Sequence, residues 1–466
     1  MTMKLLPRVL LASLAITPFA TPAAFASPLD LYGGSPLGLS LNGALTTSSE
    51  DGFAAYYNPA GLGVGGSKGK FDIQLGYFYA APDLNIHRTT PNANIPSATP
   101  VSTGYIVGSV LIPLGGPIHD KASLGVFFAL PQGTLLQASA LAPQDPQWLR
   151  YDTESERIAV GAGLGVRPIP QLSLGLGVQE FATFSGSDSF NINTPSTSGA
   201  TSTVTNESIG FGLQGATAPT AGITILPNDK WRIALAYRGA IDLKTSLPDY
   251  VNVPNLGTSL DIGASGTLMY SPHTIALGAS GEVMPGLTVG LDFQYQLWSL
   301  APVPDFDVSI VANAAPGSIV GPFLGILTGS TIQPQPKFVN TLTPSATVEY
   351  AWDEHRYAVR AAYSYRPTYV PAPGYAPTGL ESPTVVEEDY LDVNAHIVGL
   401  GGTIRVYDRV GLFPNGLDID LGYQMQILPT ATASPSAPGA TMPDPVGKMT
   451  YGGVVFVGGV ALRTRY

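Results

Sequence analysis

Cysteine is absent from all 466 residues, so neither disulfides nor thiolate metal sites can hold this fold together. Charged residues make up only 12% of the chain, and the net charge of −11 comes without a cluster of Lys or Arg, which argues against a nucleic-acid partner. Histidines are few and lie singly, without metal-site spacing, at His87, His119, His273, His355 and His396. The sequence therefore predicts no cofactor and no metal.

Long apolar runs are missing too, although 44% of the residues are hydrophobic. After the N-terminus no clean run of eighteen apolar residues occurs, so the apolar residues are distributed in short pieces. The 54 glycines, 42 prolines and abundant tyrosines favour many strands and turns over helices.

The first 26 residues have the features of a cleavable signal peptide. A basic start with Lys4 and Arg8 precedes an apolar stretch, Val9 to Ile16, that is too short to span a bilayer. Small residues follow at the expected cleavage site, Ala24 to Ala26. We therefore expect an exported protein.

Alternating apolar residues predict long strands with two different faces. The pattern is clear at 71–79, 287–297 and 417–427, where apolar residues at odd positions are interleaved with Asp, Gln, Gly or Thr. A soluble β-sandwich also produces this alternation. Strands of about eleven residues, however, suit a tilted membrane-spanning strand better than the five or six residues usual in soluble proteins.

The connections between the predicted strands alternate strictly in length. Long linkers rich in Pro, Ser and Thr follow odd-numbered strands, and short turns such as Arg167 to Pro170 and Val283 to Gly286 follow even-numbered ones. This alternation is typical of an outer-membrane barrel with long external loops and tight periplasmic turns. The fourteen predicted strands lie near 70–81, 103–113, 122–131, 151–166, 171–184, 207–226, 231–244, 273–283, 287–299, 341–352, 356–366, 390–406, 416–428 and 450–466.

The predicted fold is an all-β transmembrane antiparallel β-barrel of about fourteen strands with an N-terminal hatch inside the lumen. Lipid offers no partner for backbone N–H and C=O groups, so every strand edge must be paired. Residues 27–69 contain no convincing long strand and many small residues, so we expect them to form the hatch and residues 70–466 to form the barrel.

Several segments resemble the FadL-type outer-membrane transporters for long-chain fatty acids and their toluene and aromatic-hydrocarbon uptake relatives. The similar segments are WRIALAYRGAIDLK (231–244), SPHTIALGASGEVMPGLTVGLDFQYQLWS (271–299) and the N-terminal SPLGLSLNGALTTSSEDGFAAYYNPAGLG. The last of these carries the family's hatch motif, an acidic pair followed by Asn-Pro-Ala, at Glu50, Asp51, Asn58, Pro59 and Ala60. A plainer interpretation is that Asn58 and Pro59 only turn the chain from the hatch into the first strand.

The resemblance implies passive uptake of a hydrophobic small molecule through a plugged barrel with lateral exit, in the outer membrane of a Gram-negative bacterium. Its partners are the hydrophobic ligand and outer-membrane lipid, and we expect a monomer. The predicted hatch has no Arg or Lys before Lys68 to hold a carboxylate, so fatty acids and uncharged hydrocarbons remain alternative ligands. A nonspecific or structural porin-like barrel without a hydrophobic ligand is the other possibility.

Two apolar loops are candidate ligand-capture surfaces. They contain Leu135, Leu136, Leu141, Trp148 and Leu149 after the third predicted strand, and Phe323, Leu324, Ile326 and Leu327 after the ninth. Alternatively, these loops pack on each other and cap the barrel. In the family, a kink in the third strand forms the lateral gap, and spacing places it here at Pro131 and Gly133.

Catalytic chemistry is not expected. Ser67 lies in a Gly-x-Ser-x-Gly match, but without the strand-to-helix context of a nucleophile elbow. The acidic run Glu387 to Asp389 either binds a cation or stays solvated. Asp292, Asp418 and Asp420 are expected to face the lumen and to hydrogen-bond the hatch or water.

Overall fold

A computed structural model describes most of the chain outside the N-terminal leader and several loops. The predicted signal peptide, residues 1–26, lies outside the described part. The described residues are 28–88, 100, 102–132, 146–151, 157–193, 203–253, 258–302, 307–314, 329–330, 336–377, 385–407, 413–434 and 448–466.

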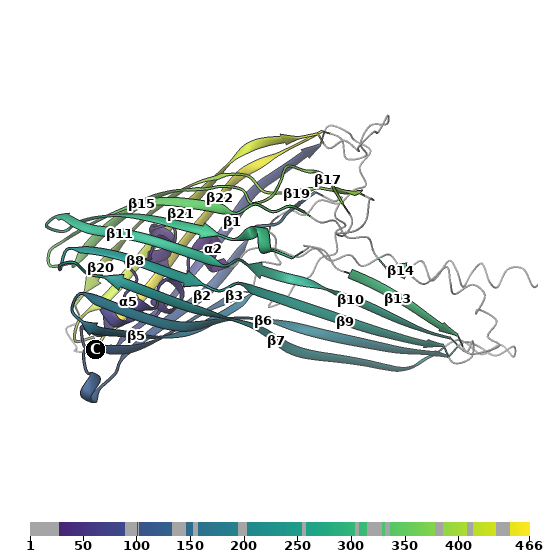
Figure 1. Cartoon of the computed structure of the whole chain (residues 1–466), viewed down its shortest axis with the longest axis horizontal. Coiled ribbons are helices and arrows are strands. Elements are labelled where there is room, and N and C mark those ends of the chain that lie inside the picture. The colour runs from purple at the N-terminus through teal and green to yellow at the C-terminus, as the bar shows by residue number, and fades with distance from the viewer. Residues whose placement is uncertain are drawn as a thin grey trace, which may run out of the picture.

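Fourteen strands form a closed antiparallel barrel, as predicted (Figure 1). Successive strands pair around the ring, and β1 pairs with β22 from Asp72–Arg465 to Arg88–Met449, which leaves no open edge there. The barrel strands are β1 (Asp72–Arg88), β2 (Thr103–Pro113), β3 (Ala122–Gln132), β5 (Ile158–Ile169), β6 (Leu172–Asn193), β7 (Thr203–Ile225), β8 (Trp231–Arg238), β11 (Thr274–Met284), β12 (Leu287–Gln296), β15 (Thr341–Trp352), β16 (Tyr357–Arg366), β20 (Ala395–Val406), β21 (Leu417–Ala433) and β22 (Met449–Arg465).

One predicted strand is too long, because the strand expected at 231–244 ends at Arg238. The residues expected to form a loop before the next strand instead form a hairpin, β9 (Ile241–Val253) and β10 (Thr258–Ser271). β10 also pairs with β13 (Asp307–Ala314), which pairs with β14 (Gly329–Ser330). Two further short pairs join β17 (Gly374–Pro377) to β18 (Val385–Glu388) and β4 (Gln147–Trp148) to β19 (Tyr390–Leu391).

Side chains alternate across the barrel wall as the sequence predicts. Leu75, Leu291 and Leu421 are 56%, 54% and 52% exposed on the outer surface. Asp292 and Asp418, in contrast, are buried in the lumen. A soluble β-sandwich would bury the apolar face, so the exposure of these leucines matches a wall whose solvent is lipid.

Exposed aromatic residues mark both ends of the outer surface. This arrangement matches the aromatic girdles with which membrane barrels meet the two lipid–water interfaces. The residues are Trp231, Tyr350, Trp352, Tyr407 and Tyr466 at the end with the short turns, and Tyr79, Tyr237, Tyr295, Tyr363 and Tyr423 at the other.

The N-terminal segment fills the lumen as a hatch, with its helices inside the ring of strands (Figure 1). Its helices are α2 (Pro28–Tyr32), α3 (Pro36–Ser40), α4 (Ala54–Tyr57) and α5 (Ala60–Gly66). α3 packs on β20 to β22, and α5 packs on β3, β5 and β6 across the ring. Within the described part of the chain, no helix is long and apolar enough to cross a membrane.

Candidate functional site

Asn58 joins the hatch to the barrel wall. Its side-chain amide Nδ2 donates to the Thr46 carbonyl at 2.8 Å and to the Thr224 hydroxyl on β7 at 2.9 Å, while its Oδ1 accepts from the Ala60 N–H at 3.1 Å. The third bond is made with Ala60, the first residue of α5. Asn58 is 1% exposed, and Gly222 opposite it leaves the room that a side chain would occupy. The motif therefore does more than turn the chain into β1.

The acidic pair of the hatch motif lies in two different environments. Glu50 forms ion pairs with Lys68 of the hatch and Arg232 of β8. Burial by itself raises the pKa of Glu50, but the two cations outweigh it and lower the pKa to about 2. Asp51 lies 3.7 Å from Arg463, and its burial raises the pKa of this carboxyl above the ordinary value.

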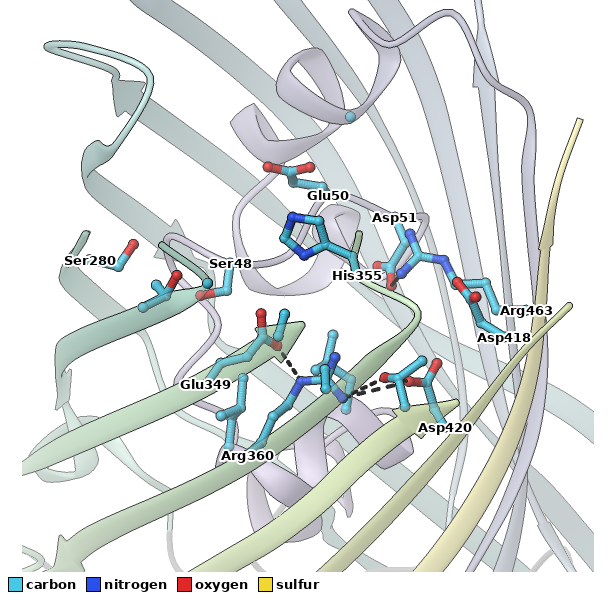
Figure 2. Close-up of a pocket in the computed structure, with 18 of the residues that line it drawn as sticks. Ser48, Glu50, Asp51, Ser280, Glu349, His355, Arg360, Asp418, Asp420 and Arg463 are labelled. Atoms are coloured by element: carbon cyan, nitrogen blue, oxygen red, sulfur yellow. Dashed lines mark hydrogen bonds and ion pairs between the residues drawn. The ribbon is translucent and has the colours of Figure 1, made fainter. Parts of the chain in front are cut away.

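A polar cavity of about 780 Å³ lies between the hatch and the ends of the strands that carry the short turns (Figure 2). Arg465 bridges Asp72 at 3.0 Å and Asp418 at 3.1 Å, and Arg360 reaches Asp420 at 3.6 Å. His355 projects into this space near Glu50 (Figure 2). The lining contains ion-paired side chains as well as apolar ones, so the cavity is not a continuous apolar site for a hydrocarbon.

Buried aromatic side chains of the barrel wall pack against the hatch. Phe78 stacks on Tyr105 with ring centroids 5.1 Å apart, and Phe127 lies 5.9 Å from Phe53 of the hatch. We call Phe78, Tyr105, Phe127 and Phe181 the aromatic wall; each is at most 1% exposed. The sequence by itself gives no sign of this cluster, because an aromatic residue on a strand carries no signal of its neighbours on other strands.

The aromatic wall ends beside a mismatch in the sheet. β3 pairs with β2 as far as Gln132, whereas its register with β5 runs only from Ala122 to Ala129. We call the strand ends beyond this last pair, starting at Leu130 and Ile158, the β3–β5 notch. Pro131, which has no N–H to donate, lies in it and pairs with Tyr105 on the β2 side. Gly133, the other predicted gap residue, lies outside the described residues.

Three comparisons place this geometry among known proteins. No family model matches the sequence. Alkane uptake protein A of Marinobacter nauticus is 24% identical over 418 residues, which cover 85% of this chain and 83% of that protein. A Pseudomonas aeruginosa FadL homologue superposes with a TM-score of 0.54 at 16% identity, over 93% of this chain and 98% of the other. The Pseudomonas putida toluene transporter TodX gives 0.54 at 14% identity, over 94% and 100%.

The chain has the FadL-type transporter fold. The predicted resemblance is confirmed at the level of the fold. Two of the relatives are named as an alkane uptake protein and a toluene transporter, in agreement with the prediction that the chain is not an enzyme.

The FadL-type barrel covers two of the predicted capture residues with protein. Trp148 and Leu149 are each 1% exposed, because β4 docks on β19 and buries both. Both side chains therefore pack against the segment of β19, which belongs to neither of the two predicted capture loops. The other predicted capture residues lie outside the described part: Leu135, Leu136, Leu141, Phe323, Leu324, Ile326 and Leu327.

The remaining polar candidates are structural in this FadL-type chain. Asp292 accepts from the Thr46 N–H of the hatch at 3.3 Å, as predicted for a lumen carboxylate. Asp389 was expected to stay solvated or bind a cation, but it is fully buried beside the β4–β19 pair, where its carbonyl accepts from the Gln147 N–H at 3.2 Å. Ser67 follows α5 and donates to the Val64 carbonyl at 2.7 Å. Among the described residues, no cluster has metal-binding geometry.

Proposed function

We propose that the protein takes up hydrophobic compounds across the outer membrane by passive diffusion, with long-chain fatty acids and hydrocarbons as the candidate classes. A ligand moves from the external loops to the aromatic wall and leaves sideways through the β3–β5 notch. The protein acts as a monomer, and its hatch motif holds the plug that directs this route.

The observation that carries this proposal is the position of the aromatic wall directly beside the notch. Phe127 on β3 lies two residues before Ala129, the last β3 residue that pairs with β5. Ala159, the β5 partner of Ala129, pairs on its other side with Phe181 of β6. A ligand on the aromatic wall therefore lies next to the point where pairing between β3 and β5 ends. The names of the relatives, an alkane uptake protein and a toluene transporter, support hydrophobic cargo.

A nonspecific porin is the less favoured alternative. A porin conducts through an open, water-filled lumen. Here α3 packs on β20 to β22 and α5 on β3, β5 and β6, and the hatch residues Leu39, Tyr56 and Leu62 are buried. This packing supports a plugged barrel over an open pore.

A disulfide lock tests the lateral route, because the chain has no cysteine of its own. Extending the β3–β5 register by one residue sets Leu130 opposite Ile158, so the pair Leu130→Cys and Ile158→Cys closes the notch when oxidised. The matched control is Val126→Cys with Ala162→Cys, a pair on the same face within the intact ladder.

Uptake of radiolabelled hexadecane, toluene and oleate is measured in a Gram-negative host without its own FadL-type transporter. We expect oxidation to abolish uptake by the notch pair, reduction to restore it, and the control pair to be insensitive to both. Uptake that survives the locked notch would refute lateral exit. The predicted gap residue Gly133 gives a second test, since replacing it with valine should also slow uptake.

A further inference from the structure

Residues 146–151, which we call the outer strap, separate two hydrophobic clusters. Trp148 and Tyr151 belong to the cluster that contains the aromatic wall, whereas Leu149 belongs to an outer cluster with Trp298 and Tyr369. On the proposed route, a ligand from the external side reaches the aromatic wall past the strap. Arg150 lies between Leu149 and Tyr151 in the chain, and its guanidinium packs over the rings of Trp298 and Tyr369 in the outer cluster.

Arg150 is buried and its charge is already neutralised by the protein. Its guanidinium lies 4.7 Å over the Tyr369 ring, and its Nη2 pairs with Asp392 at 3.0 Å. The two side chains are only 5% and 1% exposed. Because water is excluded, the carboxylate of Asp392 cancels most of the attraction that Arg150 would exert on another anion.

The neighbouring cations are occupied as well. Arg238 pairs with Asp30 of the hatch at 2.9 Å. Arg366 donates to Gln426 at 2.6 Å and also to the Tyr151 hydroxyl. Asp30, Arg150 and Arg366 together line a small cavity of about 30 Å³, large enough for a water molecule. The Nε–H of Arg150 has no hydrogen-bond acceptor among the described residues.

We propose that Asp392 is the specificity-determining residue that makes this transporter select uncharged hydrocarbons and reject fatty-acid anions. This inference rests on the proposed uptake function and deepens it. A carboxylate that enters the strap region loses its hydration and meets Asp392 rather than a free cation, so its passage is unfavourable. A hydrocarbon has no such loss and gains apolar contacts.

Removing the charge of Asp392 reverses the selection. The variant Asp392→Asn keeps the shape of the side chain and leaves Arg150 as a buried cation with a spare N–H donor. Arg150 is then able to pair with a fatty-acid carboxylate. The double variant Arg150→Gln with Asp392→Asn removes both charges and should not gain this ability. Asp242→Asn, which frees Lys244 from its ion pair at 3.2 Å at an exposed site, is the control for loss of one negative charge.

Three ligands of equal chain length separate charge from hydrophobicity: hexadecane, 1-hexadecanol and hexadecanoate at pH 7.5. For the wild type we expect saturable uptake of the first two and background uptake of hexadecanoate. Asp392→Asn should raise hexadecanoate uptake at least about tenfold, which corresponds to about 1.4 kcal/mol. The double variant and Asp242→Asn should keep the wild-type pattern. Heat-modifiable migration on gels reports whether each barrel is folded.

Wild-type uptake of hexadecanoate at the rate of hexadecane would overturn the specificity role, even if no variant folds. A folded Asp392→Asn barrel with unchanged hexadecanoate uptake would overturn it as well. If none of the three ligands enters above the empty-vector background, the proposed uptake function itself fails. The two failures are therefore distinguishable.

Discussion

Replacing Asn58 with alanine should loosen the hatch without unfolding the barrel. The substitution removes three hydrogen bonds of 2.8 to 3.1 Å: one to the Thr224 hydroxyl of the barrel wall, and two within the hatch, to the Thr46 carbonyl and from the Ala60 N–H. The Thr46 carbonyl and the Ala60 N–H then remain buried without these partners. The strand pairing of the barrel does not involve Asn58.

The magnitude follows from the bond to Thr224, which crosses from the hatch to the wall. A buried group that loses its partner costs about 1–3 kcal/mol, so the closed hatch should lose about 1–3 kcal/mol relative to a displaced one. Since every 1.4 kcal/mol is a factor of ten, the population of displaced hatch should rise roughly 5-fold to 150-fold.

A reporter cysteine measures this population directly. Thr220 lies under the hatch, where it is 1% exposed and its hydroxyl donates to the Ala55 carbonyl at 3.2 Å. In a Thr220→Cys background, Asn58→Ala should speed labelling by a polar maleimide by the factor above and raise ion conductance across a planar bilayer. Asn228→Ala, in an exposed turn where Asn228 accepts from the Lys230 and Trp231 N–H groups, is the control. A labelling rate within about twofold of the Thr220→Cys parent would refute the anchoring role of Asn58.

Two further predictions concern the same hatch. The pKa of Glu50 is lowered from 4.5 to about 2, so its ion pairs stabilise the closed hatch fully above pH 4.5 and are lost as the pH falls toward 2. The ion conductance of the wild type should therefore rise over this pH interval, whereas that of Glu50→Gln should not. Parallel pH profiles of the two proteins would contradict this prediction. Gly175→Ala should also displace the hatch and raise conductance, because the new Cβ would lie 2.1 Å from the Pro59 carbonyl carbon. The control Gly458→Ala, whose new Cβ would meet no atom within 4 Å, should conduct like the wild type. Equal conductance of the two variants would argue against close packing of the hatch on β6.

Charge pairing in the lumen divides the molecule into two environments with different roles. Below the hatch, Arg360, Arg463 and Arg465 form a network with carboxylates around a polar cavity. On the other side lie the aromatic wall and the notch. Buried charges make the first environment less favourable for a hydrophobic ligand, which supports the proposed lateral route.

The local pattern of the chain was sufficient to predict the barrel, its fourteen strands and the face of each residue. Side chains alternate with a period of two along any strand, so Leu291 and Asp292 take opposite faces wherever the strand lies. The long and short connections set the orientation of the strands, and the lack of strand patterning in residues 27–69 marked the hatch.

Only the tertiary structure decided which distant residues meet. Arg150 and Asp392 are 242 positions apart, and Phe127 and Phe181 come together because β3, β5 and β6 are neighbours with a particular register. The sequence alone favoured Trp148 as a ligand contact, yet pairing between β4 and β19 buries it. Periodicity is a property of each segment by itself, whereas these contacts depend on closing the barrel and on how its outer loops fold back over the lumen.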